Sequence, residues 1–383
     1  MAHPSVQDIF LRFYLKYLDK YIPSPQQSKV ANCIINCKTG AYGANISMCE
    51  DCGHLQIHYN SCRNRCCPMC QALPKEKWID KRREDVLDAP YFHVVFTLPQ
   101  ALNPLIYSNQ QLLYDAMYHC VSETINELTA DTKHLGAKVG YICVLHTWGS
   151  EMNYHPHIHI LLTGGGINKL GKWENIKDIS HINQNLILNK IIKKLTIYIK
   201  THNLLYYGRY SYLKNKDNLN DYLDNIKKDK WNIHINKPYK SVLDIYEYFG
   251  KYAFRVCITN ERIKNITDTH VTFTYKDKNN RDITKETTIK GEEFIRKFLM
   301  HSLPNRIISV VRCPDGIDGT MFFKKHLENE TEGITKIEIL NKINGKDVTI
   351  CTFCQKGTYY LYKEIYLNKS PPKKDKDIIK QTP

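Results

Sequence analysis

The chain has 383 residues and a formal net charge of +15. It exceeds one average domain in length, and no stretch of about 18 consecutive apolar residues occurs, which excludes a membrane-spanning helix. The excess of Lys and Arg favours a nucleic-acid partner, although a Lys-, Ile- and Asn-rich composition is also typical of an AT-rich genome. No long apolar segment of the signal-peptide type is present near the start, so we expect a cytoplasmic protein.

Apolar residues at helical spacing predict two helices at the start of the chain, over 6–22 and 26–37, followed by a cysteine-rich segment. Further helices are predicted over 75–86, 103–128, 182–200, 242–254 and 292–301, and strands over 93–97, 137–148, 155–163, 271–275, 282–289 and 306–312. The strands over 137–148 and 155–163 should be neighbours, and those over 271–275 and 282–289 should form a hairpin. The last fifteen residues are rich in Lys and Pro and are expected to be disordered.

This order of elements predicts an α+β fold with antiparallel strands, divided into three consecutive parts. Residues 1–75 would form a helical, cysteine-rich domain, and residues 76–312 a larger α+β domain. Residues 201–237, inside the second part, are polar and are expected to be an irregular insertion. Residues 313–383 carry no assigned role.

The cysteines predict metal binding rather than disulfides. Eight of the fourteen lie between Cys33 and Cys70, and in a reducing compartment such a cluster is typical of a metal site. Two C-x-x-C pairs are separated by fourteen residues, which is the pattern of a structural four-thiolate Zn²⁺ site. The predicted ligands are Cys49, Cys52, Cys67 and Cys70, with Cys62 and Cys66 as possible substitutes.

Other cysteines leave alternatives open. Cys33 and Cys37 have helical spacing and are either buried thiols or a second metal pair. Cys351 and Cys354 form a third C-x-x-C, which has no evident partner pair and is therefore interpreted as half of a site. Arg63 and Arg65 lie between the two N-terminal pairs and indicate a DNA contact.

The segment over 154–166 contains three histidines within five residues, followed by an apolar run and three glycines. Side chains alternate along a strand, so His155, His157 and His159 would share one face. Neighbouring positions on that face are about 6.6 Å apart, from ~3.3 Å per residue, and two imidazoles at this spacing can converge on one metal ion. The segment is either part of a metal-dependent nuclease or a solvated, histidine-rich strand.

Tyr248 and Tyr252 are four residues apart in the helix predicted over 242–254 and would share one face. Because the chain has 26 tyrosines, ordinary packing is the simpler interpretation of the pair taken alone. A tyrosine hydroxyl is a poor nucleophile near its ordinary pKa of about 10, so attack would need a metal-polarised phosphate held in line.

Together these segments resemble the rolling-circle transposases of the insertion-sequence ninety-one family, which belong to the HUH (His, bulky hydrophobe, His) single-strand DNA nickases. The matching stretches are 49–71, 93–99, 148–150, 155–166, 248–262, 271–277 and 293–304, so the resemblance covers about residues 5–312. The chain departs from the family pattern at Cys66, where a histidine is expected, and after Arg312.

The resemblance implies that His157 and His159 supply two metal ligands and that Tyr248 and Tyr252 are paired nucleophiles. It implies that residues 1–75 are the zinc-binding domain and residues 76–312 the HUH catalytic domain. That domain would contain a five-stranded antiparallel sheet related to the RNA-recognition fold, with the His strand central and the tyrosine helix packed over it. A third polar ligand usually precedes the pair. We assign it to Glu151, with His146 and His155 as alternatives.

The implied activity is nicking and rejoining of single-stranded DNA at transposon ends and target sites, through a 5′-phosphotyrosine intermediate and with Mg²⁺ or Mn²⁺. Two alternatives remain. A non-catalytic zinc-containing protein, such as an inactive transposase copy, would bind nucleic acid in a salt-dependent way without a covalent adduct. A hydrolytic metalloenzyme would cleave DNA with a metal-activated water and no tyrosine dependence.

Overall fold

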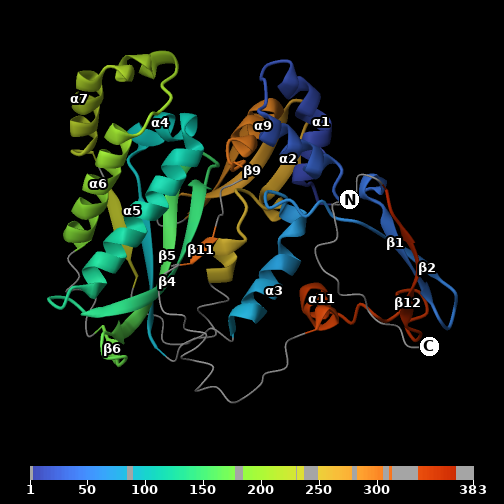
Figure 1. Ribbon diagram of the computed structural model, residues 1–383. Helices are drawn as coiled ribbons and strands as arrows, with labels where there is room; N and C mark the ends of the chain where they lie inside the picture. The colour runs from blue at the N-terminus through green and yellow to red at the C-terminus, as the bar shows by residue number, and fades with distance from the viewer. Residues whose placement is uncertain are drawn as a thin grey trace. The chain divides into compact units, whose positions relative to one another are not determined.

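The computed structural model describes residues 3–83, 89–176, 184–229, 231–236, 249–277, 283–304, 310–312 and 335–367. Helices and antiparallel sheets make up these residues, which confirms the α+β class (Figure 1). The chain divides into two compact units. The first unit comprises Met1–Pro74, Ile258–Leu299 and Ile334–Pro383, and the second comprises Lys75–Cys257 and Met300–Gly333. This division does not follow the three consecutive parts expected from the sequence, because segments far apart in the chain join the N-terminal residues.

The helices of the first unit confirm three predicted helices and begin at clear capping signals. α1 (Val6–Leu18) starts after Ser5, whose side chain accepts from the Asp8 N–H while the Asp8 carboxylate accepts from the Ser5 N–H. α2 (Pro25–Ile35) begins with the same arrangement around Ser24. α9 (Gly291–Leu299) packs against α1, where the Phe10 and Phe298 rings meet edge to face with centroids 5.3 Å apart.

Two three-stranded antiparallel sheets complete the first unit. One has the order β10–β9–β8, formed by β8 (Ile263–Ile266), β9 (His270–Asp277) and β10 (Ile283–Lys290), and it confirms the predicted hairpin. The other has the order β12–β1–β2, formed by β1 (Ala44–Cys49), β2 (Leu55–Tyr59) and β12 (Tyr359–Ile365). α11 (Lys336–Asn344) precedes β12 in the chain. The C-terminal strand therefore pairs with a strand of the cysteine-rich segment.

The second unit is built on one larger sheet with the order β11–β4–β5–β3–β7, in which every neighbouring pair is antiparallel. Its strands are β3 (Tyr91–Thr97), β4 (Ala137–Trp148), β5 (Tyr154–Asn168), β7 (Asn232–Ile235) and β11 (Val310–Arg312), with β6 (Trp173–Asn175) paired to β5. The prediction that the strands over 137–148 and 155–163 are neighbours is confirmed. β5, which carries the histidines, is the central strand.

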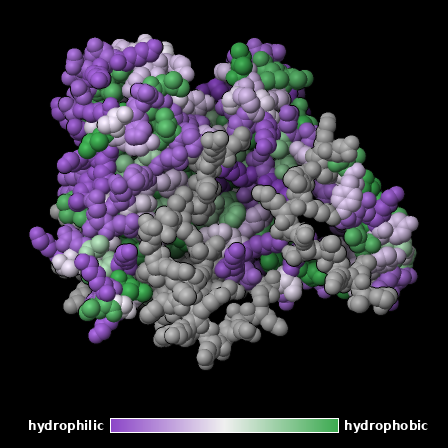
Figure 2. All heavy atoms as spheres, viewed as in Figure 1, coloured by the Kyte–Doolittle hydropathy of each residue, from purple (hydrophilic) through white to green (hydrophobic). Residues whose placement is uncertain are grey.

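Different elements pack on the two faces of this sheet. One face is buried in the main hydrophobic core, under α4 (Asn103–Ser108), α5 (Gln110–Ala130), α6 (Gln184–Thr201) and α7 (Lys216–Ile226), with Phe96, Leu145 and Ile158 fully or almost fully buried. Figure 1 shows α5 and α6 side by side beside β4 and β5. The outer surface of these helices is mainly hydrophilic (Figure 2). The opposite face packs against Phe249, which is fully buried.

The expectation that residues 201–237 form an irregular insertion is wrong. The segment contains the 3₁₀ helix Gly208–Lys214, α7 and β7, and β7 joins the sheet beside β3. Leu219 and Leu223 lie one helical turn apart and are buried in the main core. Few apolar residues, spaced for a single helical face, were enough to form this helix in a strongly polar stretch of sequence.

Several predicted elements extend beyond the described residues. α3 (Ala72–Arg83) covers most of the helix predicted over 75–86. The predicted helix over 103–128 is divided into α4 and α5 at the buried Asn109, whose side chain donates to Leu105 O and Leu205 O. Residues 242–248, 306–309 and the last fifteen residues lie outside the described part of the chain.

Candidate metal centres

The second unit brings three buried histidines together on the face of the sheet away from the main core. In the β4–β5 hairpin His146 is the direct partner of His157, and His159 follows two residues later on the same face. One potential ligand atom from each of the three rings lies within 4.8 Å of the others. The turn that sets this register is closed by the Gly149 N–H, which donates to Asn153 O at 2.9 Å, and is anchored by the fully buried Met152.

The assignment of Glu151 as the third ligand is not supported by this geometry. Glu151 lies in the hairpin turn with its side chain exposed, and the group of potential ligands found here among the described residues consists of His146, His157 and His159. His146 completes the group because a register shift in the hairpin, between His146 and Trp148, pairs it with His157. The sequence offered His146 as an alternative ligand, but the register shift that pairs it with His157 is seen only in the structure.

Burial keeps two of these imidazoles, those of His146 and His159, neutral. Desolvation, with a smaller contribution from the positive charge of Arg255, lowers the pKa of His146 to about 3. Desolvation also holds the pKa of His159 well below its ordinary value, with a further contribution from the neighbouring histidines. Neutral imidazole is the form that binds metal ions, so at neutral pH these rings need lose no proton before they bind.

One nitrogen of each ring is engaged by the protein. His157 Nδ1 lies 2.7 Å from His155 O, and His146 Nε2 lies 2.8 Å from Tyr252 O. His159 Nδ1 lies 2.9 Å from His93 Nε2. A hydrogen bond at one ring nitrogen fixes the orientation and tautomer of the imidazole, so the other nitrogen of each ring would be the ligand atom.

One of the two predicted nucleophiles lies against this group. Residues 249–253 are helical, and Phe249 packs on Tyr91, Val144 and Leu161 of the sheet. The Tyr252 ring centroid is 4.4 Å from that of His159 and 5.1 Å from that of His93. Tyr248 lies outside the described residues.

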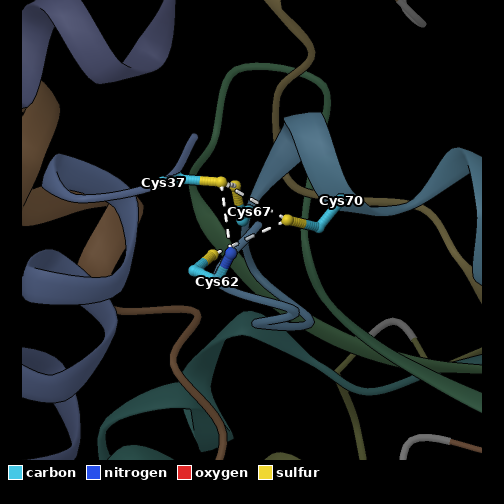
Figure 3. A group of neighbouring side chains, drawn as sticks. All are labelled: Cys37, Cys62, Cys67 and Cys70. Carbon is cyan, nitrogen blue, oxygen red and sulfur yellow. Dashed lines mark hydrogen bonds between the residues drawn. The ribbon is translucent and has the colours of Figure 1, made fainter. Parts of the chain in front are cut away.

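Four cysteines of the first unit form a second candidate centre. The sulfur atoms of Cys37, Cys62, Cys67 and Cys70 point toward one another, and all four residues are buried (Figure 3). Cys37 Sγ lies 3.5 Å from Cys70 Sγ and 3.6 Å from Cys67 Sγ. Sulfur atoms bound to one tetrahedral Zn²⁺ at about 2.3 Å are ~3.8 Å apart, so the group requires little adjustment to hold zinc.

The grouping of cysteines predicted from the sequence is therefore corrected. The structure does not bring Cys49 and Cys52 to Cys67 and Cys70. Instead Cys49 and Cys52 meet Cys351 and Cys354, while Cys37 and Cys62 complete the other group. The physical reason is that the β1–β2 hairpin carries Cys49 and Cys52 at its turn and pairs with β12, which brings the C-terminal C-x-x-C beside them.

Other residues singled out in the sequence have structural explanations or stay predictions. Cys33 and Cys66 are outside both groups. The three glycines at the end of β5 are sites of close approach: a Cβ on Gly166 would lie 2.2 Å from Lys138 O, and one on Gly165 would lie 2.5 Å from the Trp173 ring. Arg63 is exposed in the loop between Cys62 and Cys67.

Comparisons with known proteins match the chain to transposases. Residues 9–98 match the family model Zn_Tnp_IS91, "Transposase zinc-binding domain", and residues 140–313 match the model Y2_Tnp, "Putative transposase". The chain is 35% identical over 311 residues to "Putative transposase y4qJ" of Sinorhizobium fredii (strain NBRC 101917 / NGR234), and the aligned segment covers 79% of this chain and 77% of the relative. It is 26% identical over 290 residues to "Transposase for insertion sequence element IS801" of Pseudomonas savastanoi pv. phaseolicola, and the aligned segment covers 73% of this chain and 67% of the relative.

Among the described helices, none combines the length and the hydropathy that a membrane-spanning helix needs.

Proposed function

The chain belongs to the family of IS91-type transposases, and from this premise we propose that it nicks and rejoins single-stranded DNA through a 5′-phosphotyrosine intermediate. The observation that carries the proposal is the position of the Tyr252 ring, whose centroid lies 4.4 Å from that of His159 in the group of three buried histidines. A nucleophile next to a metal-binding group is what phosphoryl transfer from DNA to a tyrosine requires.

The donor set favours Mn²⁺ over Mg²⁺. His146, His157 and His159 offer three imidazole nitrogen atoms, whereas Mg²⁺ prefers oxygen ligands and gives up its water reluctantly. A bound ion would polarise the scissile phosphate and stabilise the charge that develops on it. The Arg255 guanidinium lies close enough to lower the pKa values of His146 and His159, and it would add positive charge for the same phosphate.

The proposed transfer needs no ATP, because the energy of the broken phosphodiester bond is kept in the bond between phosphorus and the tyrosine oxygen. The hydroxyl oxygen of Tyr252 or Tyr248 attacks the phosphorus atom, and the bond from phosphorus to the 3′ oxygen breaks. The proton lost by the tyrosine is balanced by the one taken up by the 3′ oxygen, which leaves as a hydroxyl group. Attack of a 3′-hydroxyl on the phosphotyrosine reverses the step and rejoins DNA, and the second tyrosine permits a second transfer before the first is resolved.

In the first unit we propose that Cys37, Cys62, Cys67 and Cys70 are the Zn²⁺ ligands of the matched zinc-binding domain. All four lie within residues 9–98. Their role would be structural, because four thiolates leave no position open for substrate. Arg63, exposed between two of the ligands, and Arg65 would contact the DNA backbone.

The test is incubation of the purified protein with labelled single-stranded DNA from the ends of the element, followed by a denaturing gel. We expect label that stays covalently attached to the protein, with more product in Mn²⁺ than in Mg²⁺ and none in excess chelator. Cleaved DNA without an adduct would instead indicate hydrolysis by a metal-activated water. Binding without cleavage would indicate a non-catalytic protein.

The histidine group also predicts an effect of Asn236. Its side-chain amide lies 3.0 Å from His93 Nδ1, and its backbone N–H donates to His93 O at 3.0 Å. If His159 binds metal through Nε2, its Nδ1–H donates to His93 Nε2, and His93 Nδ1–H then donates to Asn236. The amide must turn so that its oxygen faces His93. Asn236 thus positions His159 through His93.

Asn236→Ala is therefore expected to weaken Mn²⁺ binding about 10- to 100-fold, the usual effect of removing such an outer hydrogen bond. Calorimetric titration of the full chain with Mn²⁺ measures this. Asn232→Ala is the matched control, because Asn232 is exposed on the same strand, β7. Equal affinities in the two variants would contradict a positioning role for Asn236.

A further inference from the structure

We infer that Cys49, Cys52, Cys351 and Cys354 form a second four-thiolate Zn²⁺ site, which joins the C-terminal segment to the N-terminal one. The two C-terminal ligands lie outside both segments that the family models match. Cys52 and Cys351 are 299 positions apart in the chain, yet their sulfur atoms are neighbours. The site is independent of the DNA chemistry proposed above.

The sulfur positions fit a zinc ion and no disulfide. Cys49 Sγ lies 3.8 Å from Cys354 Sγ, and Cys52 Sγ lies 3.8 Å from Cys351 Sγ. Four sulfur atoms held at about 2.3 Å from one tetrahedral Zn²⁺ are ~3.8 Å apart, whereas the sulfur atoms of a disulfide are separated by about 2.05 Å. The group is therefore spaced as zinc ligands are.

The two C-x-x-C loops have the same backbone design. After the second cysteine of each loop the chain turns through a left-handed residue, Gly53 with φ +70° and Gln355 with φ +59°. In each loop an N–H returns to the carbonyl of the first cysteine: Gly53 N–H to Cys49 O at 3.0 Å, and Gln355 N–H to Cys351 O at 2.9 Å. A tight turn of this kind presents both sulfur atoms on one side of the loop, so each loop supplies half of a tetrahedron.

Hydrogen bonds of the surrounding chain hold the two loops face to face. The Glu50 N–H donates to Thr358 O at 3.1 Å, and the β1–β12 pairing ends at Cys49 opposite Tyr359. The Gly357 N–H points at Cys354 Sγ, 3.4 Å away, where it would stabilise a thiolate. A Cβ on Gly357 would lie 2.6 Å from Cys49 Sγ, so this position requires glycine for the sulfur to approach.

Zinc content of the full chain tests the inference through three variants. Cys49→Ala/Cys52→Ala and Cys351→Ala/Cys354→Ala are each expected to lose one equivalent of zinc relative to the unchanged protein. The variant that carries all four of these substitutions is expected to lose the same single equivalent, because all four residues hold one ion. The matched control is Cys120→Ala/Cys143→Ala, two buried cysteines of the second unit that belong to neither group. Every variant keeps the three histidines, so any zinc bound there cancels from the comparison.

Full zinc content in Cys351→Ala/Cys354→Ala would overturn the inference, as would loss of two equivalents in the quadruple variant. A second measurement needs no variant. Cys52 is exposed and Cys354 half-buried, so as free thiols both would react quickly with N-ethylmaleimide. In the zinc-loaded protein we expect both to be protected, and to become reactive together with Cys49 and Cys351 when a chelator removes the metal. Rapid labelling of Cys52 or Cys354 in the zinc-loaded protein would also overturn the inference.

Discussion

The Tyr248→Phe/Tyr252→Phe variant is expected to form no covalent DNA adduct and to cleave single-stranded DNA at least about 10³-fold more slowly than the unchanged protein. Loss of a nucleophile removes the chemical step itself, which costs more than loss of a positioning residue. Phenylalanine keeps the ring that packs beside His159 and His93, so the fold and the histidine group should be unchanged. The measurement is single-turnover cleavage of end-labelled DNA in Mn²⁺, with the protein–DNA adduct counted on the same gel.

The matched control is Tyr207→Phe, which removes the hydroxyl of an exposed tyrosine in the same unit. It should cleave at the normal rate. The two single variants then separate the roles of the tyrosines, because a residue that acts only in the second transfer will still allow the first adduct to form. If the double variant cleaves as fast as the control, the tyrosine mechanism is wrong and a metal-activated water remains.

The second large effect is expected from the metal ligands. His157→Ala should lower Mn²⁺-dependent cleavage by about 10³-fold, because the scissile phosphate would lose its Lewis acid. His146→Ala should have an effect of similar size, since the structure makes it the third member of the group. Metal binding, measured by titration with Mn²⁺, should weaken in both variants while DNA binding by the basic surface is retained.

Glu151→Ala tests the assignment of Glu151 as the third ligand. Its exposed side chain in the hairpin turn lies outside the group, so cleavage should be unchanged. His155→Ala is the matched variant on β5. It keeps the backbone carbonyl that bonds to His157 Nδ1 and removes the imidazole, whose ring centroid lies 5.3 Å from that of His157. A large loss in Glu151→Ala together with normal activity in His146→Ala would restore the assignment made from the sequence.

Local patterns in the sequence predicted the parts of these centres that lie within one element. Side chains two apart on a strand share a face, so the positions of His157 and His159 relative to each other follow from the strand alone. The antiparallel pairing of residues 137–148 with 155–163 was also predictable, since two apolar, β-rich runs are separated by a short turn. The position of His146 opposite His157 was not predictable in this way, because it depends on a register shift between His146 and Trp148.

The cysteines show where local patterns stop being informative. Each C-x-x-C pair is a tight turn that brings two sulfur atoms together, and this much depends only on the adjacent residues. Which pair meets which depends on the β1–β12 pairing between residues 44–49 and 359–365. Nothing in the spacing of Cys49, Cys52, Cys67 and Cys70 indicates that a strand more than 300 residues later occupies the edge of β1.

By itself the sequence determined the α+β class, the histidine pair, the candidate tyrosines and the presence of thiolate pairs, because each depends on residues that are close in the chain. Only the tertiary structure decided which residues complete each centre. His146 joins through the register of a hairpin, Tyr252 through the packing of Phe249 on the sheet, and Cys351 and Cys354 through a strand from the far end of the chain. Ligand sets are complete only when distant segments meet, and strand pairing and core packing determine where they meet.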